Sequence, residues 1–416
     1  MTVPTINATI NFSTGAVFAS AMQINIGKLG INVLGSPGGV VVDVSSQVDS
    51  IQTVRGRNAL ADQFQAGTLT MRIVDQNGDF NPQNTTGPYY GLLDPMRKIQ
   101  ITATYLGVTY PIFAGFILSY NTITPKNVGD VVYTTITAVD GLQLLNNAQV
   151  TTVAGTSAGQ LSGARITNLL DAVSWPSTQR IIDTGQTTLQ ADPGTGRTVL
   201  AACQTVQISE YGAFYMDASG NAVFKDRLTC TKSPAAVTPV VFNDNGSNIS
   251  YFNALWLLND AQIFNKAFIT ATGLAVQTAQ NDASITKYFT HGYTQTDLLM
   301  QTTTDALNYA RAYVASRAET TVRCDAITLD LYTANYTTGT VAALDLDFFD
   351  PVTITTTQPA ATGTSTLTKT LQVFGVAHSI TVNSWKTTLI TLEPIIDGFL
   401  IGSTLYGVLG TNTLSY

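Results

Sequence analysis

The sequence predicts a mainly β protein with an inserted α/β region. Three observations support this class: alternation of apolar and polar residues dominates, three segments have helical spacing instead, and a pattern of strands near the N-terminus recurs near the C-terminus. The composition agrees, because only 11% of the residues are charged and threonine, which favours extended chain, is abundant. With 416 residues, the chain is long enough for about two to four domains.

Alternation with a period of two predicts strands, for example at residues 23–26, 68–74 and 99–105. Turn dipeptides separate such segments, and Asn77-Gly78 is one of them. Asp75 to Asp79 also resembles a calcium loop, but the glycine comes early and the closing glutamate is absent. A tight turn is therefore the preferred interpretation of this segment.

Helical spacing replaces the alternation at residues 161–173, 198–210 and 303–318. The apolar face of the first predicted helix consists of Leu161, Ile166, Leu169, Leu170 and Val173. The face of the third consists of Leu307, Ala310 and Val314. We interpret these faces as surfaces packed on a core, and Gly212 as the end of the second helix.

The helices divide the chain into five predicted parts. Two β-barrel domains are expected to flank smaller α/β and α+β domains, with a hairpin at 214–225 following the second helix. The parts are a first β-barrel domain (1–150), a peripheral α/β domain (151–235), an α+β connecting domain (236–320), a second β-barrel domain (321–395) and a glycine-rich C-terminal docking tail (396–416).

The expectation of two barrels rests on an internal recurrence. Asp94-Pro95 precedes one strand and Asp350-Pro351 another. Each is followed by a strand with Phe and Gly at its middle, at 111–120 and 371–380. A threonine-rich strand then closes each set, at 132–140 and 385–393. Two similar barrels around an inserted region would produce this order, and chance similarity between threonine-rich strands is the alternative.

The charge balance argues against a nucleic-acid-binding protein. The formal net charge is −7, so the sequence has no basic footprint. Four arginines nevertheless fall within one stretch: Arg55, Arg57, Arg72 and Arg97. We interpret them as surface or interface charges, paired with carboxylates such as Asp62 or Asp75 of a neighbouring subunit.

Other features predict that the protein folds in a reducing cytoplasm. Cys203, Cys230 and Cys324 are far apart and have no zinc-site spacing, which predicts buried free thiols. The N-terminal residues lack the basic and apolar segments of a signal peptide. No stretch of 18 apolar residues occurs, so no membrane insertion by this chain is expected.

The search for catalytic chemistry gives no candidate site. His291 and His378 are distant in sequence, and no metalloprotease, nucleophile-elbow or phosphate-loop motif occurs. The carboxyl groups of Glu210, Asp217 and Asp226 are close in sequence, but two of them fall in a predicted hairpin's turn and strand. The sequence therefore predicts no catalytic, cofactor-binding or metal-binding residues, and no cofactor.

Several segments, taken in order, resemble the minor tail proteins, or baseplate hub proteins, of long-tailed bacteriophages. Pro88-Tyr89-Tyr90 and the strand start at residues 94–97 belong to this resemblance. The other segments that carry it are 54–68, 73–82, 111–116, 199–225 and 400–410. The likeness runs in patches over nearly the whole chain, and no single motif in it is as specific as a zinc site.

The resemblance implies a structural virion protein at the tail tip and not an enzyme. Such hub proteins form a trimer in which two tube-forming barrels per chain give six barrels around an axis. The ring closes or extends the tail tube, anchors fibre or receptor-binding subunits and provides the channel for DNA ejection. The implied partners are the distal tail protein, the tape measure protein and tail fibre subunits, and DNA passes without specific binding. Larger hub proteins continue into a fibre or hydrolase region, so attachment and wall cleavage are expected on separate subunits here.

Three alternatives remain open at this point. A distal tail ring protein would be a hexamer with one tube barrel per chain. A tail-associated cell-wall hydrolase would cleave peptidoglycan. A receptor-binding module would present aromatic side chains on loops, for which Pro88-Tyr89-Tyr90 is the one clustered candidate in the sequence.

Overall fold

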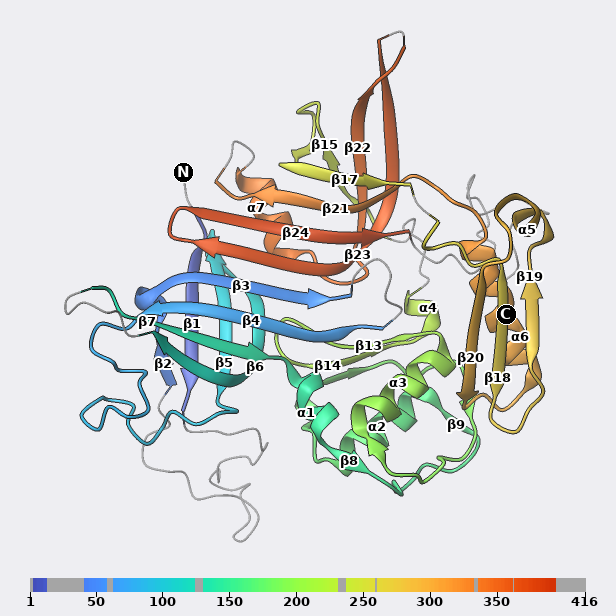
Figure 1. Cartoon of the computed structure of the whole chain (residues 1–416), viewed down its shortest axis with the longest axis horizontal. Helices are drawn as coiled ribbons and strands as arrows, with labels where there is room; N and C mark the ends of the chain where they lie inside the picture. Colours follow the sequence, from blue (N-terminus) through green and yellow to red (C-terminus); the bar gives the residue numbers. More distant parts are fainter. Residues whose placement is uncertain are drawn as a thin grey trace.

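The computed structural model describes residues 3–12, 41–57, 63–123, 130–230, 237–258, 260–332, 336–361 and 363–393. Strands dominate these residues, and most of the strands belong to one 14-stranded sheet (Figure 1). The prediction of a mainly β chain is therefore confirmed. The strand predicted at 23–26 and the tail at 396–416 lie outside the described residues.

Five strands near the N-terminus form a unit that we call the first repeat. They are β3 (Val48–Gly56), β4 (Gln65–Val74), β5 (Lys98–Tyr105), β6 (Val108–Ile123) and β7 (Tyr133–Val139). Their order in space is β3-β4-β7-β6-β5, and every pair is antiparallel. The strands predicted at 68–74 and 99–105 are found as β4 and β5.

Five later strands form the second repeat. They are β17 (Asn253–Leu257), β21 (Arg323–Asp330), β22 (Pro351–Pro359), β23 (Thr364–Thr381) and β24 (Ser384–Leu392). Their order in space is β17-β21-β24-β23-β22, again with every pair antiparallel. In both repeats the first strand pairs with the second, the second with the fifth, the fifth with the fourth and the fourth with the third. The recurrence in the sequence is thus a recurrence of topology.

The two Asp-Pro motifs do not occupy equivalent positions, although the strands they precede do. Pro351 is the first residue of β22, whereas Pro95 lies three residues before β5. The equivalent residues are Met96 and Phe349, which have positive φ angles of 66° and 73°. The N–H of Met96 donates to Ile117 and the N–H of Phe349 to Val373. The same bend therefore precedes the third strand of each repeat.

The repeats are joined directly, because β23 pairs with β3 as well as with β22 and β24. Short strands extend the sheet: β1 (Thr5–Asn11) and β2 (Val41–Asp43) beyond β5, and β15 (Val240–Asn243) and β16 (Ile249–Ser250) beyond β22. One continuous hydrophobic core, which includes Ile51, Met71, Ile136, Ile327 and Leu389, fills both repeats.

A smaller α/β region follows the first repeat and has its own core (Figure 1). Its helices are α1 (Gly141–Asn147), α2 (Ser162–Ala172), α3 (Val199–Glu210) and α4 (Arg227–Cys230). The helices predicted at 161–173 and 198–210 are confirmed, as is the hairpin of β13 (Ala213–Met216) and β14 (Ala222–Lys225). Its remaining short strands are β8 (Gln149–Val150), β9 (Gln160–Leu161), β10 (Arg180–Ile182), β11 (Thr188–Leu189) and β12 (Arg197–Thr198).

A third core lies under α6 (Thr303–Arg317), the third predicted helix, and is built on β18 (Lys266–Ala271), β19 (Gln277–Gln280) and β20 (Gly292–Leu298). Its buried face is centred on Ala306, Tyr309 and Tyr313, so Leu307 is only half-buried. Four helices were not predicted: α1, α4, α5 (Asp282–Tyr288) and α7 (Tyr336–Asp345). The α7 sequence carries threonines and Gly339, which favour strands or turns, and tertiary packing overrides that preference.

Candidate functional surface

Eight strands lie side by side across the large sheet in the order β17, β21, β24, β23, β3, β4, β7 and β6. We call them the central arc. Figure 1 shows the arc from β17, near the top, through β24 and β23 to β3, β4 and β7. Along β3, β4, β7, β21 and β24 buried residues alternate with more accessible ones, so one side of the arc packs on the core. The other side, which we call the arc face, is accessible.

Small polar side chains make up most of the arc face. One row that crosses five adjacent strands consists of Ser379, Gln52, Thr70, Thr137 and Ser119. These residues are exposed or half-buried. The hydroxyl groups of Ser119 and Thr137 are 2.7 Å apart and form a cross-strand hydrogen bond. Hydroxyl and amide groups thus give the face polarity without net charge.

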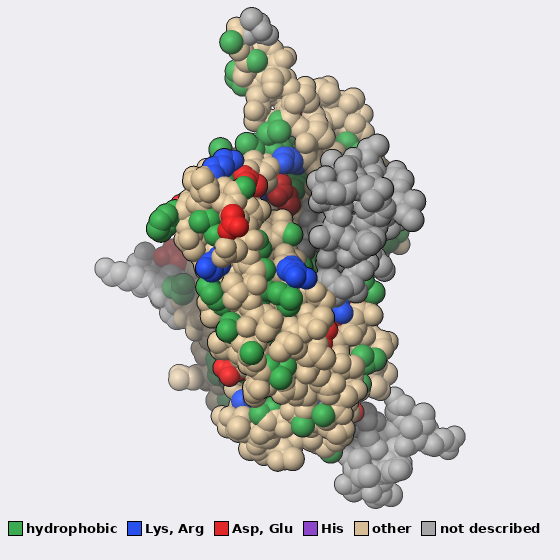
Figure 2. Space-filling view, turned by 90° about the vertical axis from the view of Figure 1, so that its right-hand side faces the viewer, with side chains coloured by type: hydrophobic (Ala, Val, Ile, Leu, Met, Phe, Trp, Pro, Cys, Tyr) green, Lys and Arg blue, Asp and Glu red, His purple; other side chains and the backbone are tan. Residues whose placement is uncertain are grey.

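Charged groups are sparse on the arc face and lie next to opposite charges or aromatic rings. A second row consists of Thr381, Ser50, Arg72, Thr135 and Asn121. Its one charge, Arg72, is paired with Asp49 at 2.5 Å and packs over the Tyr133 ring. Lys386 lies opposite Asp330 in the β21–β24 pair, with its ammonium group 4.3 Å from the Phe252 ring centre. Figure 2 shows another side of the molecule, the one with β18–β20 and α6 on the right of Figure 1, and this surface is also mostly uncharged with scattered charges.

The arginines singled out in the sequence are paired within the chain, and this corrects the expectation that they meet a neighbour's carboxylates. Arg55 and Asp347 are 3.1 Å apart. Arg97 and Asp94 are 2.6 Å apart. The Arg57 guanidinium packs 4.3 Å from the centre of the Phe374 ring. The Arg55 and Arg57 contacts arise because β3 runs beside the second repeat, which is far away in the sequence, whereas the Arg97–Asp94 pair is local.

Of the two carboxylates expected across an interface, Asp75 is engaged within the chain. Asp62 lies outside the described residues. Asp75 is buried and accepts hydrogen bonds from the Asp79 N–H at 2.7 Å and the Thr134 hydroxyl at 2.8 Å. The turn predicted at Asn77-Gly78 is confirmed, with Gly78 at φ 65°. Asp75 therefore organises that turn and ties it to β7.

The carboxylates considered for hydrolysis hold loops together. Glu210, at the end of α3, is buried and accepts from the Ser162 hydroxyl at 2.7 Å and the Thr187 N–H at 2.8 Å. Asp217 accepts from two N–H groups of its own hairpin turn. Asp226 accepts from the Thr229 N–H at 2.9 Å and begins α4. Because Glu210 and Asp226 are both buried, no two of these three carboxylates are exposed to solvent together.

Two buried ionisable groups near the junction of the repeats have shifted pKa values. Burial, with the nearby Arg55 charge, lowers the pKa of His378 to about 3. Its Nδ1 accepts a hydrogen bond of 3.3 Å from the Trp385 indole N–H. Burial raises the pKa of Asp140 to about 7, although its carboxylate accepts from the Gly67 and Leu142 N–H groups. Both groups are enclosed by the core, so they act on stability rather than on a substrate.

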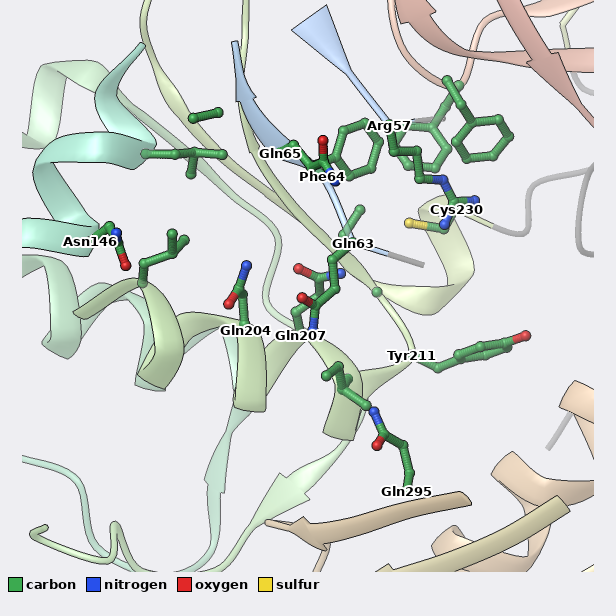
Figure 3. Close-up of a pocket in the computed structure, with 18 of the residues that line it drawn as sticks. Arg57, Gln63, Phe64, Gln65, Asn146, Gln204, Gln207, Tyr211, Cys230 and Gln295 are labelled. Carbon is green, nitrogen blue, oxygen red and sulfur yellow. The ribbon is translucent and has the colours of Figure 1, made fainter. Parts of the chain in front are cut away.

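A cavity of about 610 Å³ lies between the start of β4, helices α1 and α3, and β20 (Figure 3). Figure 3 shows amide side chains around it, among them Gln63, Gln65, Asn146, Gln204 and Gln295. Among the described residues that line it, none is Asp, Glu or His. The cavity therefore offers hydrogen-bonding groups and aromatic surface, but no acid–base pair for hydrolysis.

Other chemistry is limited in the part of the chain that the structure describes. No group of three or more His, Cys, Asp or Glu side chains there could hold a metal ion. The three cysteines are free thiols, and burial raises the pKa of the Cys324 thiol to about 12. Within the described residues no helix is long and apolar enough to cross a membrane.

Comparison with known proteins shows where this fold occurs. The chain is similar to a tail protein from Neisseria meningitidis MC58, with a TM-score of 0.56 and 11% identity over 94% of this chain and 97% of that one. It is also similar to a 43 kDa tail protein of prophage MuSo2 from Shewanella oneidensis, with a TM-score of 0.54 and 14% identity over 86% and 97% of the two chains. No family model and no curated protein matches the sequence. The resemblance to phage tail proteins inferred from the sequence is thus confirmed at the level of the fold.

Proposed function

We propose that the protein is a structural subunit of a bacteriophage tail tip, where three copies form the hub ring that closes or extends the tail tube. The observation that carries the proposal is the pair of repeats with identical strand order. Each repeat supplies one barrel, so a threefold ring presents six similar units. Such a ring docks on a sixfold tube without unmatched surfaces.

The arc face is the surface proposed to line the channel. Bound lysine and arginine side chains would hold passing DNA by releasing its counterions. The rows of Ser, Thr, Gln and Asn carry little charge, and three chains together have a formal charge of −21, three times the −7 of one chain. A lining of this kind lets DNA pass during ejection without retaining it.

The proposed ring also implies a role for the parts of the chain outside the two barrels. Residues 151–235 form a peripheral domain outside the tube, 236–320 connect the repeats, and 396–416 are a docking tail. Within 236–320, β17 belongs to the second repeat and β15 pairs with β22 of that repeat, and both extend the sheet of the second barrel. The faces of the ring bind the distal tail protein, the tape measure protein and tail fibre subunits, and the protein has no enzymatic role.

The mass of the purified protein in solution tests this proposal. Mass photometry is expected to give three chains per particle at concentrations where the ring is assembled. Six chains per particle would instead support a distal tail ring with one barrel per chain. Clearing of peptidoglycan by the purified chain in a zymogram would contradict the non-enzymatic role.

A further inference from the structure

The junction between the two repeats shows how one barrel joins the next. It pairs β3, the first strand of the first repeat, with β23, the fourth strand of the second repeat. The pairing is antiparallel and runs from Gly56 opposite Gly375 to Ser50 opposite Thr381. β3 pairs only with residues 375–381 of β23, which follow the bulge in that strand, because residues 364–372 pair with β22.

The internal junction joins a first strand to a fourth strand. The other first strand, β17, and the other fourth strand, β6, have no such partner within the described residues and lie at the two ends of the central arc. One edge is β17, which pairs with β21 and with no other described strand. The other edge is the far half of β6, whose partner β5 extends only as far as Phe116. Exposed apolar side chains mark both edges: Leu255 is 52% exposed and Ile123 is 65% exposed.

The fourth strands of the two repeats can be aligned residue by residue. Ile117 and Val373 are equivalent. The carbonyl oxygen of each accepts a hydrogen bond from the bend residue before the third strand of its repeat, Met96 or Phe349. Both strands have a bulge directly afterwards, between Ile117 and Ser119 and between Val373 and Gly375. Counting on from the bulge, Ile123 corresponds to Ser379.

The first strands align through their neighbours. Ser119 pairs with Thr137, and Gly375 pairs with Ile390, so Thr137 and Ile390 are equivalent. Thr70 pairs with Thr137, and Ala326 pairs with Ile390, so Thr70 and Ala326 are equivalent too. Gln52 pairs with Thr70 and Leu255 with Ala326, which makes Leu255 the equivalent of Gln52.

We propose that β17 of one copy pairs antiparallel with residues 119–123 of β6 in a second copy, and that this junction closes the ring. Gln52 faces Ser379 inside the chain, so Leu255 faces Ile123 between chains. The inference rests on the proposed ring and specifies its contact. The internal junction has the polar pair Gln52 and Ser379. The proposed junction between chains has an apolar pair at the equivalent positions, which are exposed in the single chain.

The physical case for this junction is twofold. Unpaired N–H and C=O groups on an exposed, apolar edge strand invite pairing with another chain, and β17 carries the exposed Phe252, Leu255 and Leu258 at or beside it. Directly opposed apolar residues on antiparallel strands also stabilise the pairing of those strands. Because the two edges differ, the contact is head-to-tail and makes a ring only if the rotation closes.

The strand count fits a tube. The arc contains eight strands, so three copies joined in this way form a cylinder of 24 strands. At roughly 4.8 Å per strand, such a cylinder is at least about 37 Å across between backbones, and strand tilt widens it further. Side chains reduce the opening, which still admits a DNA double helix.

Cysteine cross-linking between two single variants tests the junction. One chain carries Ile123→Cys and the other Leu255→Cys, both in a Cys230→Ser background that removes the half-buried thiol. After oxidation, the mixture is expected to give a covalent dimer, and neither variant alone should do so. Phe252→Cys is the matched control: it is 56% exposed but lies three residues, about 10 Å, away along the strand. Mixed with Ile123→Cys, it should stay uncoupled.

The double variant Ile123→Cys/Leu255→Cys completes the test, with native mass spectrometry of the same unoxidised sample. Covalent species that end at three chains support the junction and the ring. Trimers whose cysteines do not couple would overturn the β17–β6 junction and leave the ring intact. Coupled species longer than three chains would support the junction and contradict threefold closure. A chain that stays monomeric and uncoupled would contradict both.

Discussion

Arg55 in the first repeat and Asp347 in the second are joined by a salt bridge of 3.1 Å at the junction of the two repeats. The Arg55 side chain is almost fully buried, and its guanidinium also packs on the Phe348 ring at 5.1 Å. Residues almost 300 positions apart in the chain thus meet where β3 joins β23. The contact ties the two units of the proposed ring segment into one body.

Asp347→Asn is expected to lower the free energy of unfolding by about 1–3 kcal/mol, because it leaves the buried guanidinium without its carboxylate. The loss is below that of a fully buried pair, since Asp347 is 35% exposed. Urea unfolding at pH 7 measures it. Asp94→Asn, which breaks the more exposed pair with Arg97, is the control and should change stability far less. Equal losses in the two variants would contradict a special role for the junction pair.

Gly56→Ala is expected to open the junction. Gly56 has φ 106°, and a Cβ there would lie 2.3 Å from the Phe374 carbonyl oxygen. Since backbone atoms cannot move aside, we expect a loss of about 3 kcal/mol or more, or failure to fold. Gly292→Ala, where a Cβ would meet nothing within 4 Å, is the matched control. Thermal unfolding that leaves both variants near the parent Tm would show that the close approach of β3 and β23 is unimportant.

His378 should make the protein less stable in acid. Its folded pKa of about 3 lies below the ordinary histidine pKa of 6.5, so between these values the unfolded chain binds a proton that the folded chain does not. Stability from this group is present above pH 6.5 and falls as the pH drops toward 3, by up to about 1.4 kcal/mol per pH unit. His378→Gln should flatten the urea-unfolding profile between pH 6.5 and 4.5. An unchanged slope of the unfolding free energy against pH would contradict the lowered pKa of His378.

Asp140 should act in the opposite direction. Its folded pKa of about 7 lies above 3.8, so stability is greatest at low pH and is lost as the pH rises through 7. Asp140→Asn removes the buried charge but keeps an acceptor for only one of the Gly67 and Leu142 N–H groups, which bond to different carboxylate oxygens. The variant is expected to gain stability relative to the parent between pH 5 and 8. A relative gain that does not grow with pH would contradict the raised pKa.

The sequence predicted those features that depend on local pattern. Alternation identified β4 and β5, helical spacing identified α2, α3 and α6, and the recurring strands indicated the two repeats. The arc face was not predicted as a surface, although Thr68 and Thr70 on β4 and Thr135 and Thr137 on β7 alternate visibly. Which strands lie side by side depends on pairings between distant residues, such as β3 with β23, that no local pattern records. The pairing of Arg55 with Asp347 was missed for the same reason.

The structure of the assembled particle, determined by cryo-electron microscopy of the purified protein, tests the central claim most directly. We predict a threefold ring in which the arc face, with Gln52, Thr70 and Thr137, lines the channel. Helices α2 and α3 should lie outside it. A sixfold ring, or a channel lined by these helices, would contradict the hub assignment. A continuous belt of lysine and arginine side chains facing the axis would contradict free passage of DNA and indicate a gate that grips it.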